Sequence, residues 1–236
     1  MGTLINAAAV VVASIIGVVF KKGLPETMQK ALMFTIGLSI MLFSIGWFLQ
    51  TFLVIDADGT ISTQGELLIL LSLVIGTLIG TRIDIDGALN RFAHHVEKTY
   101  HLPPLAKGFI SGTLIFCVGS LAILGAIEDG LSGDYTILLV KSVLDFVTAM
   151  LLAAVLGIGV IFSAISILIY QGSIYLLAMF AGDVLTDVMI NSVSMVGSII
   201  LVSMGFTFME IKSVKVANML PALLIPLIYY LISGIF

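Results

Sequence analysis

The sequence predicts an all-α, polytopic integral membrane protein with about eight transmembrane helices, and three observations support this class. Of the 236 residues, 60% are hydrophobic and only 10% are charged, and the mean hydropathy is +1.22. Soluble domains carry about 25% charged residues, whereas a membrane-spanning helix needs roughly 20 apolar residues. This composition excludes a soluble enzyme, a nucleic-acid-binding protein and a disordered chain. A single cysteine, Cys117, excludes an intramolecular disulfide framework.

Eight apolar segments follow one another along the chain. They are Thr3–Phe20, Met28–Phe52, Glu66–Gly80, Gly108–Ile127, Tyr135–Leu156, Ile158–Ala181, Ile190–Met209 and Val216–Phe236. The fifth and sixth are almost continuous, and we expect them to part at Gly157 and Gly159, where two glycines permit a tight turn.

The basic residues predict the orientation of these segments in the membrane. All but Lys141 lie in or beside three alternate connections: Lys21, Lys22 and Lys30; Arg82, Arg91, Lys98 and Lys107; Lys212 and Lys215. Cytoplasmic connections carry an excess of Lys and Arg, so these three are predicted to be cytoplasmic. The acidic connections that contain Asp58 and Asp134 are then outside, as are both termini.

The longest cytoplasmic connection, residues 84–107, has a pattern of its own. Apolar residues recur at helical spacing, from Leu89 and Phe92 to Val96 and Tyr100, with polar residues between them. This pattern is typical of an amphipathic helix on a membrane surface. The short carboxylates of the preceding Asp84–Gly87 segment predict a helix-capping turn.

An internal repeat is a further hypothesis for this single membrane domain, residues 1–236. The residues Gly-Thr-Leu-Ile occur at 2–5 and again at 112–115. Matching residues 1–83 with residues 108–182 would give two halves of inverted topology, an architecture of secondary transporters, with 183–236 as additional helices. Coincidence is the alternative, because the same four residues also occur at 76–79.

The strongest candidate site is in the fifth apolar segment, where Lys141, Ser142 and Asp145 interrupt the hydrophobic run. At about 1.5 Å per residue, Asp145 lies roughly 15 Å into the helix, near the bilayer midplane. The i,i+4 spacing allows Lys141 to pair with Asp145. Ionisable residues inside a membrane are functional candidates, so Asp145 is predicted to bind a cation or a proton, with Lys141 as its counter-charge. The alternative is an ion pair that only fixes helix packing.

A second candidate lies between the sixth and seventh segments. Asp183, Asp187 and Asn191 have i, i+4 and i+8 spacing and form one polar stripe, in which Asp187 and Asn191 are expected to lie deeper than Asp183. A solvated helix N-terminus, which favours Asp, is the alternative.

Other polar residues complete the candidate set. Gln171 and Asn6 are buried amides that could join helices or contact a substrate, Asn218 lies in the proline-containing last segment, and Asp129 ends a small-residue run. Such a run, here and in the seventh segment, favours close helix packing; a broken helix that lines a site is the alternative.

Several of these motifs together resemble a known family. They are Cys117-Val-Gly119, Ile123–Gly130, Lys141-Ser142-Val-Leu-Asp145, Gly157–Ile165, Tyr170-Gln171-Gly172 and Asn218-Met-Leu-Pro221. The chain resembles the YdfK/YqgA-like bacterial inner-membrane proteins, domain of unknown function family 554. This resemblance implies a multi-pass protein of the bacterial cytoplasmic membrane, often described as a transporter, without an established substrate. The family often has Gly after the Asp of the fifth segment, whereas this chain has Phe146.

The sequence therefore predicts a secondary transporter of a small polar or ionic solute, coupled to Na⁺ or H⁺ through Asp145. An ion channel or pore and a non-transporting membrane scaffold are the alternatives. We expect no enzyme activity, no catalytic residue, no metal site and no cofactor, because no nucleophile–base pair or metal-ligand cluster is visible. The expected partners are the lipid bilayer, the solute and further copies in a homo-oligomer, with no nucleic acid.

Overall fold

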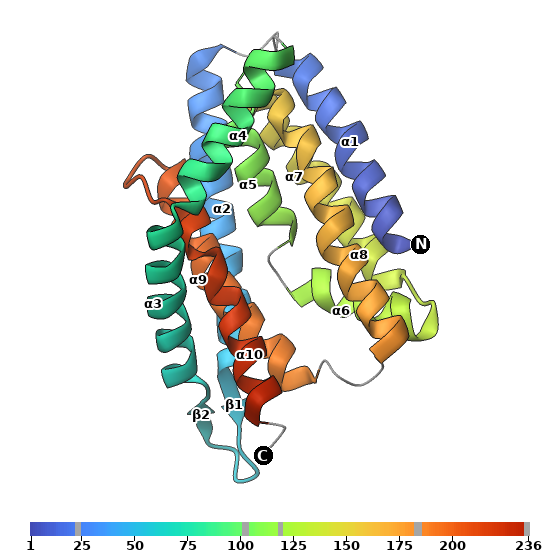
Figure 1. Cartoon of the computed structure of the whole chain (residues 1–236), viewed down its shortest axis with the longest axis vertical. Helices are drawn as coiled ribbons and strands as arrows, with labels where there is room; N and C mark the ends of the chain where they lie inside the picture. Colours follow the sequence, from blue (N-terminus) through green and yellow to red (C-terminus); the bar gives the residue numbers. More distant parts are fainter. Residues whose placement is uncertain (22–24, 101–103, 118–119, 182–185, 234–236) are drawn as a thin grey trace. The chain divides into compact units, whose positions relative to one another are not determined.

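The computed structural model describes residues 1–21, 25–100, 104–117, 120–181 and 186–233, which form α-helices, two short 3-10 helices and one small hairpin (Figure 1). In chain order they are α1 (Gly2–Lys21), α2 (Glu26–Phe52), β1 (Leu53–Ile55), β2 (Ile61–Thr63), α3 (Glu66–Ile83), α4 (Ile85–Tyr100), α5 (Ala106–Cys117), α6 (Ser120–Ser132), α7 (Thr136–Leu156), η1 (Ile158–Phe162), α8 (Ser163–Ala181), α9 (Asp187–Phe208), η3 (Val216–Leu223) and α10 (Leu224–Ser233).

Seven of these segments are long and apolar enough to cross a membrane, and the number is eight when α5 and α6 count as one bent span. The predicted all-α membrane class is confirmed, and the spans coincide with the eight apolar segments. The hairpin of β1 and β2 was not expected. It forms because Gly59 adopts a φ of 81°, and because Asp58 accepts hydrogen bonds from the backbone N–H and the hydroxyl of Thr60, at 3.0 and 2.7 Å.

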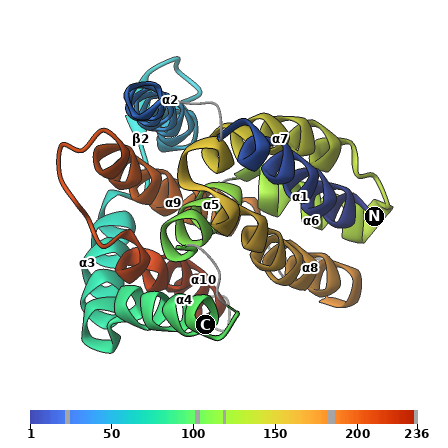
Figure 2. The same ribbon diagram turned by 90° about the horizontal axis from the view of Figure 1, so that it is seen from above.

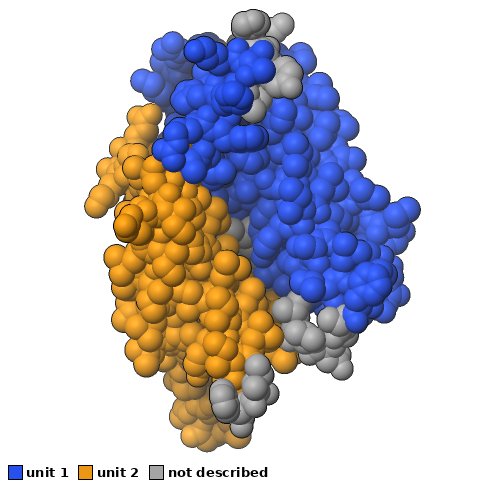
Figure 3. Space-filling view, viewed as in Figure 1, with its two compact units in different colours: residues 1–36, 88–185 blue, residues 37–87, 186–236 orange. Residues whose placement is uncertain are grey.

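The chain divides into two compact units, each described here by itself (Figure 3). Unit 1 comprises residues 1–36 and 88–185, and unit 2 comprises residues 37–87 and 186–236. These units group the helices differently from the repeats 1–83 and 108–182, and the inverted repeat stays a prediction.

In unit 1, α1 and α7 lie side by side and run in the same direction (Figures 1 and 2). A Cβ on Gly2 would lie 2.6 Å from Cβ of Leu138, and one on Gly17 would lie 2.2 Å from the carbonyl oxygen of Met150. Only glycine allows the two backbones to approach this closely at both ends of the contact.

The second contact that organises unit 1 is between the bent pair α5–α6 and the segment η1–α8. Gly108 packs on Val160, Gly112 on Ser163, and Gly130 on the backbone of Tyr175. The pairs advance together along both segments, so α5 and α6 both run in the direction of α8. We infer that the pair crosses the membrane once, with a 60° bend, and does not turn back.

The small-residue run over Gly108–Ile127 packs closely on a neighbouring segment, as the contacts of Gly108 and Gly112 show. The run is also divided between α5 and α6, which are bent by 60° to each other. Residues 118 and 119 lie outside the described residues, and a site lined by a broken helix there stays a prediction. The other small-residue run belongs to α9, an unbroken helix that buries Ser194, Gly197 and Ser198.

In unit 2, α3 packs antiparallel against η3. A Cβ on Gly76 would lie 2.3 Å from Cα of Ala222, and one on Gly80 would lie 2.0 Å from the carbonyl oxygen of Asn218. Both glycines are buried, one helical turn apart. The contact therefore positions Asn218 at the end of α3 where the chain turns into α4.

The predicted capping turn is present at this junction. Asp84 ends α3 with a φ of 56°, and its carboxylate accepts a hydrogen bond from the N–H of Gly87 at 3.3 Å. The N–H of Asp86 donates to Oδ1 of Asn218 at 2.8 Å. Two free N–H groups at the start of α4 are thereby satisfied. The location of α4 on the membrane surface stays a prediction.

Candidate functional site

The charged pair of α7 is buried inside unit 1. Nζ of Lys141 donates to Oδ2 of Asp145 in an ion pair within one helix face. The side chains are 7% and 10% exposed. Taking both charges out of water is costly unless they stay paired, so neither partner is an ordinary surface charge.

Two amides from other helices are linked to this ion pair through Asn6. Nδ2 of Asn6, on α1, donates to Oε1 of Gln171, on α8, at 3.5 Å, and Asn6 also lies within hydrogen-bonding reach of the Asp145 carboxylate. Both amide residues are completely buried. The parallel contact of α1 with α7 places Asn6 there. We call Asn6, Lys141, Asp145 and Gln171 the polar cluster.

The polar cluster is not saturated with hydrogen bonds. Oδ1 of Asn6 and Nε2 of Gln171 are buried and have no hydrogen-bond partner among the described residues. Buried polar groups in native structures almost always have partners, and leaving one without a partner costs about 1–3 kcal/mol. An unpartnered acceptor and donor beside an ion pair fit a site that binds a polar guest.

The broken span ends its first half at the same place. Cys117 is the last described residue of α5 before the break, and it interacts electrostatically with Lys141 and Asp145. The sequence analysis predicted the Lys141–Asp145 pair and named Asn6 and Gln171 as buried amides, and the structure links the two amides to each other beside the pair. It also adds Cys117, for which the only signal in the sequence was a polar atom inside an apolar segment.

Ser142 does not extend the polar cluster. Its hydroxyl donates to the carbonyl oxygen of Leu138, 2.6 Å away on the same helix. This bond satisfies the hydroxyl donor within α7. The hydroxyl oxygen keeps lone pairs that could accept from a ligand or contact a cation, so the predicted role of Ser142 in binding stays a prediction.

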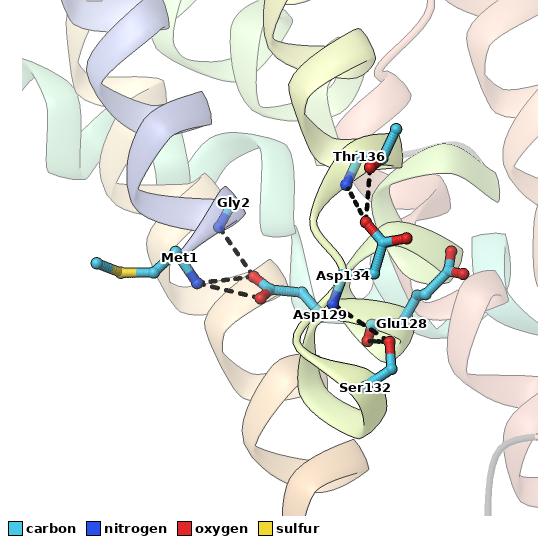
Figure 4. A network of polar contacts seen from close by, with 7 residues as sticks. All are labelled: Met1, Gly2, Glu128, Asp129, Ser132, Asp134 and Thr136. Carbon is cyan, nitrogen blue, oxygen red and sulfur yellow. Dashed lines mark hydrogen bonds and ion pairs between the residues drawn. The ribbon is translucent and has the colours of Figure 1, made fainter.

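Asp129 holds the start of α1 (Figure 4). Its buried carboxylate accepts from the terminal amine of Met1, at 2.8 and 3.2 Å, and from the N–H of Gly2 at 2.9 Å. A carboxylate at a helix N-terminus is favoured by the helix dipole. These partners differ from the polar cluster and make Asp129 an anchor of α1; its predicted role as a ligand of a substrate or ion stays a prediction.

The remaining candidates belong to unit 2. Asp187 is the exposed first residue of α9, and Asn191 is half-buried one turn later. Asp183 lies outside the described residues, so the expectation that Asp187 and Asn191 lie deeper than Asp183 stays a prediction, while the exposed position of Asp187 fits the alternative of a solvated helix N-terminus. Asn218 is buried, but its side-chain oxygen is occupied by the backbone of α4. Within the described ranges, no three His, Cys, Asp or Glu side chains could together hold a metal ion.

The fold and the polar cluster define the class of protein: a polytopic α-helical membrane protein with an ion pair buried inside its spans. The chain belongs to the family described as "Protein of unknown function (DUF554)", whose model matches residues 1–231, so the resemblance noted from the motifs is confirmed.

Two relatives are similar over nearly their whole length. One is "Uncharacterized membrane protein YdfK" of Bacillus subtilis (strain 168), 35% identical over 225 residues, which are 95% of this chain and 93% of the relative. The other is "Uncharacterized protein YqgA" of Escherichia coli (strain K12), 32% identical over 229 residues, 95% of this chain and 94% of the relative. No solved structure matches.

Proposed function

We propose that this protein is a secondary transporter of a small polar or ionic solute, coupled to a cation or proton through Asp145. One observation carries the proposal: a buried Lys141–Asp145 ion pair beside two amides that retain unpartnered polar atoms. Substrate sites of secondary transporters lie near the bilayer midplane, at helices that are interrupted. The break after Cys117 supplies such an interruption at the polar cluster.

The chemistry of the pair supports a transport cycle. A charge left alone at the bilayer centre costs about 2.5–3.5 kcal/mol. Any ligand that takes up one charge of the pair therefore frees the other to find a new partner, and the pair has two alternative states. Such a bistable element is what a conformational cycle requires.

The proposal has further parts that concern the whole protein. We place it in the bacterial cytoplasmic membrane with both termini outside, because the basic connections alternate with acidic ones. We assign it a homo-oligomeric assembly, no catalytic residue and no cofactor apart from the coupling ion. A channel and a non-transporting scaffold are the alternatives that the experiment below separates from it.

The test compares Asp145→Asn, Lys141→Met and the double variant, with Thr148→Ala on the same helix as the matched control. Thr148 is suitable because its exposed hydroxyl bonds the carbonyl oxygen of Leu144 in its own helix. Each single variant should lower the melting temperature of the detergent-purified protein, and the double variant should recover most of the loss, because no charge is left unpaired. Melting is measured with and without sodium and across pH.

The responses to sodium and pH separate the functions. For a coupled transporter, the stabilisation of the wild type by sodium or by protons is lost in Asp145→Asn and in the double variant, and kept in Thr148→Ala. If stabilisation by sodium or protons is unchanged in Asp145→Asn, Asp145 does not bind the coupling ion. The ion pair then only supports helix packing, as expected for a scaffold. Solute flux in proteoliposomes that persists without any cation or proton gradient would indicate a channel.

A further inference from the structure

We propose that the polar cluster binds one small monovalent anion together with one proton, so that the transported solute is an anion and the coupling ion is H⁺. This inference rests on the proposed function and deepens it. Three observations carry it: the charge balance of the pair, the hydrogen-bond donors of the two neighbouring amides, and the position that the Lys141 ammonium already occupies.

The first observation is the charge balance. The Asp145 carboxylate and the Lys141 ammonium together carry no net charge, and both are buried. A net charge in a low-dielectric interior is strongly disfavoured. When a proton forms an O–H bond on Asp145 and an anion enters beside Lys141, the loaded site is again neutral. An anion alone would leave a net negative charge, and a sodium ion alone would leave a net positive charge.

The second observation is the set of donors. Once Asp145 is protonated, the Lys141 ammonium loses its anionic partner and needs another acceptor. Nε2 of Gln171 is buried without a partner among the described residues, and Nδ2 of Asn6 is held near it by a long bond of 3.5 Å. An ammonium and two amide N–H groups from three helices can all donate to one anion, for which charge-assisted hydrogen bonds are the strongest kind.

The third observation concerns the competing ion. A sodium ion bound by Asp145 would have to share the carboxylate with the ammonium that already contacts Oδ2. Like charges at this separation repel strongly where the dielectric constant is low. A proton binds to a single carboxylate oxygen and needs no coordination shell. It can therefore replace the Lys141 ammonium as the partner of the Asp145 carboxylate.

The other ionisable groups around α7 do not supply a second charge to this balance. The Cys117 thiol of α5 interacts with both members of the pair, and Tyr170 of α8 interacts with Cys117; both are neutral groups in their protonated forms. On α1 and α6, the terminal amine and Asp129 pair with each other. Lys107 of α5 and Glu128 of α6 are exposed.

The experiment measures anion binding and proton uptake together on the full chain purified in detergent. Potassium salts of chloride, nitrate, formate and lactate are titrated in by calorimetry, in pairs of buffers whose ionisation enthalpies differ, at acidic and at alkaline pH. We expect at least one of these anions to bind with uptake of about one proton per anion. In the pH range where Asp145 is ionised in the anion-free protein, the affinity for the anion should weaken by about tenfold for each unit by which the pH rises.

Two variants on α8 make the test specific. Gln171→Glu keeps the size of the side chain but replaces its donor with an acceptor, and we expect anion affinity to fall by about 10- to 100-fold. Ser173→Ala, two residues further on, is the matched control, because its hydroxyl bonds the carbonyl oxygen of Tyr170; it should keep wild-type affinity. Melting curves without anion test whether both variants fold. If Gln171→Glu does not fold, Gln171→Met replaces it in the binding experiment.

The outcomes separate this inference from the proposed function. Binding without proton uptake, equal affinity in Gln171→Glu, or no binding of any of the four anions overturns the inference. If sodium chloride stabilises the protein where choline chloride does not, and Asp145→Asn abolishes the effect, sodium is the coupling ion. The inference then fails while the proposed function stands. If neither anions, sodium nor pH act through Asp145, both fail.

Discussion

At the scale of single residues, Glu97 shows how one carboxylate joins the helix α4 to the start of the next helix, α5. Its Oε1 accepts hydrogen bonds from the N–H groups of Leu105, at 2.5 Å, and Ala106, at 3.3 Å, and its Oε2 contacts Nδ1 of His94 at 2.6 Å. Glu97 therefore caps the start of α5, the first half of the broken span, from α4. The hydrogen bond from Leu105 is the main cause that lowers the pKa of Glu97, and the contact with His94 adds to it.

The lowered pKa of Glu97 predicts a pH dependence of stability. Because the folded pKa lies below the ordinary value of 4.5, the stabilisation is complete above that value and is lost as the pH falls through the folded pKa. We expect Glu97→Gln to melt at a lower temperature than the wild type at neutral pH, and the difference to shrink in acid. Melting curves of detergent-purified protein across this range measure it, with Glu128→Gln at an exposed position as the control. A difference that does not change with pH would argue against the carboxylate cap.

At the scale of elements, glycines determine which helices approach each other. The backbones of α1 and α7, and of α3 and η3, touch where one residue has no side chain. Without a hydrophobic driving force between helices in lipid, such van der Waals contact is the main source of association. The polar cluster depends on it, because the α1–α7 contact is what places Asn6 beside Asp145.

The contact of α3 with η3 gives a prediction of its own. In Gly80→Ala the new Cβ would lie 2.0 Å from the carbonyl oxygen of Asn218. Because this oxygen belongs to the backbone, the clash is relieved only if α3 and η3 move apart. We expect a loss of about 1–3 kcal/mol of stability, as for other overpacked interiors. Gly46→Ala, in α2, is the control, because nothing lies within 4 Å of its Cβ position and alanine favours a helix. Thermal or denaturant unfolding should show a lower stability than the wild type for Gly80→Ala but not for Gly46→Ala. If Gly80→Ala is as stable as the wild type, α3 and η3 are not packed this closely.

At the scale of the whole molecule, the structure relates the number of spans to the direction of each helix. In unit 1, α1 and α7 are parallel. If α2 and α3 each cross the membrane and α4 lies on its surface, as predicted, α5–α6 also crosses, because an odd number of crossings separates two parallel spans. The eight-span topology from the basic residues and this packing therefore agree, although they rest on different observations.

Topology is testable by labelling single cysteines in a background where Cys117 is replaced by Ala. We expect positions 98 and 212 to be protected from a membrane-impermeant thiol reagent in intact cells, and positions 58 and 134 to react. Position 22 belongs to the same prediction but lies outside the described residues. External reaction at position 98 would overturn the orientation, since all three basic connections share one side.

Much of the fold was predictable because the bilayer acts directly on the sequence. Every backbone polar group in hydrocarbon must be satisfied within the helix, so long apolar runs become spans whatever surrounds them. The eight segments, the turn at Gly157 and the cap at Asp84 follow from such local rules. The pairing of Lys141 with Asp145 is also local, because four residues separate them on one helix face.

Only the tertiary structure decided which distant residues share a site. Asn6 and Gln171 are separated by 165 positions, and their meeting depends on glycine contacts between helices that no periodicity reveals. For the same reason Asp129 and Asn218, which look like intramembrane ligands in the sequence, prove to be partners of backbone N–H groups. The sequence determined that charges are buried in this membrane protein, since apolar runs surround them. Helix packing determined which of them stand beside unpartnered polar atoms, because it is packing that brings separate helix faces together.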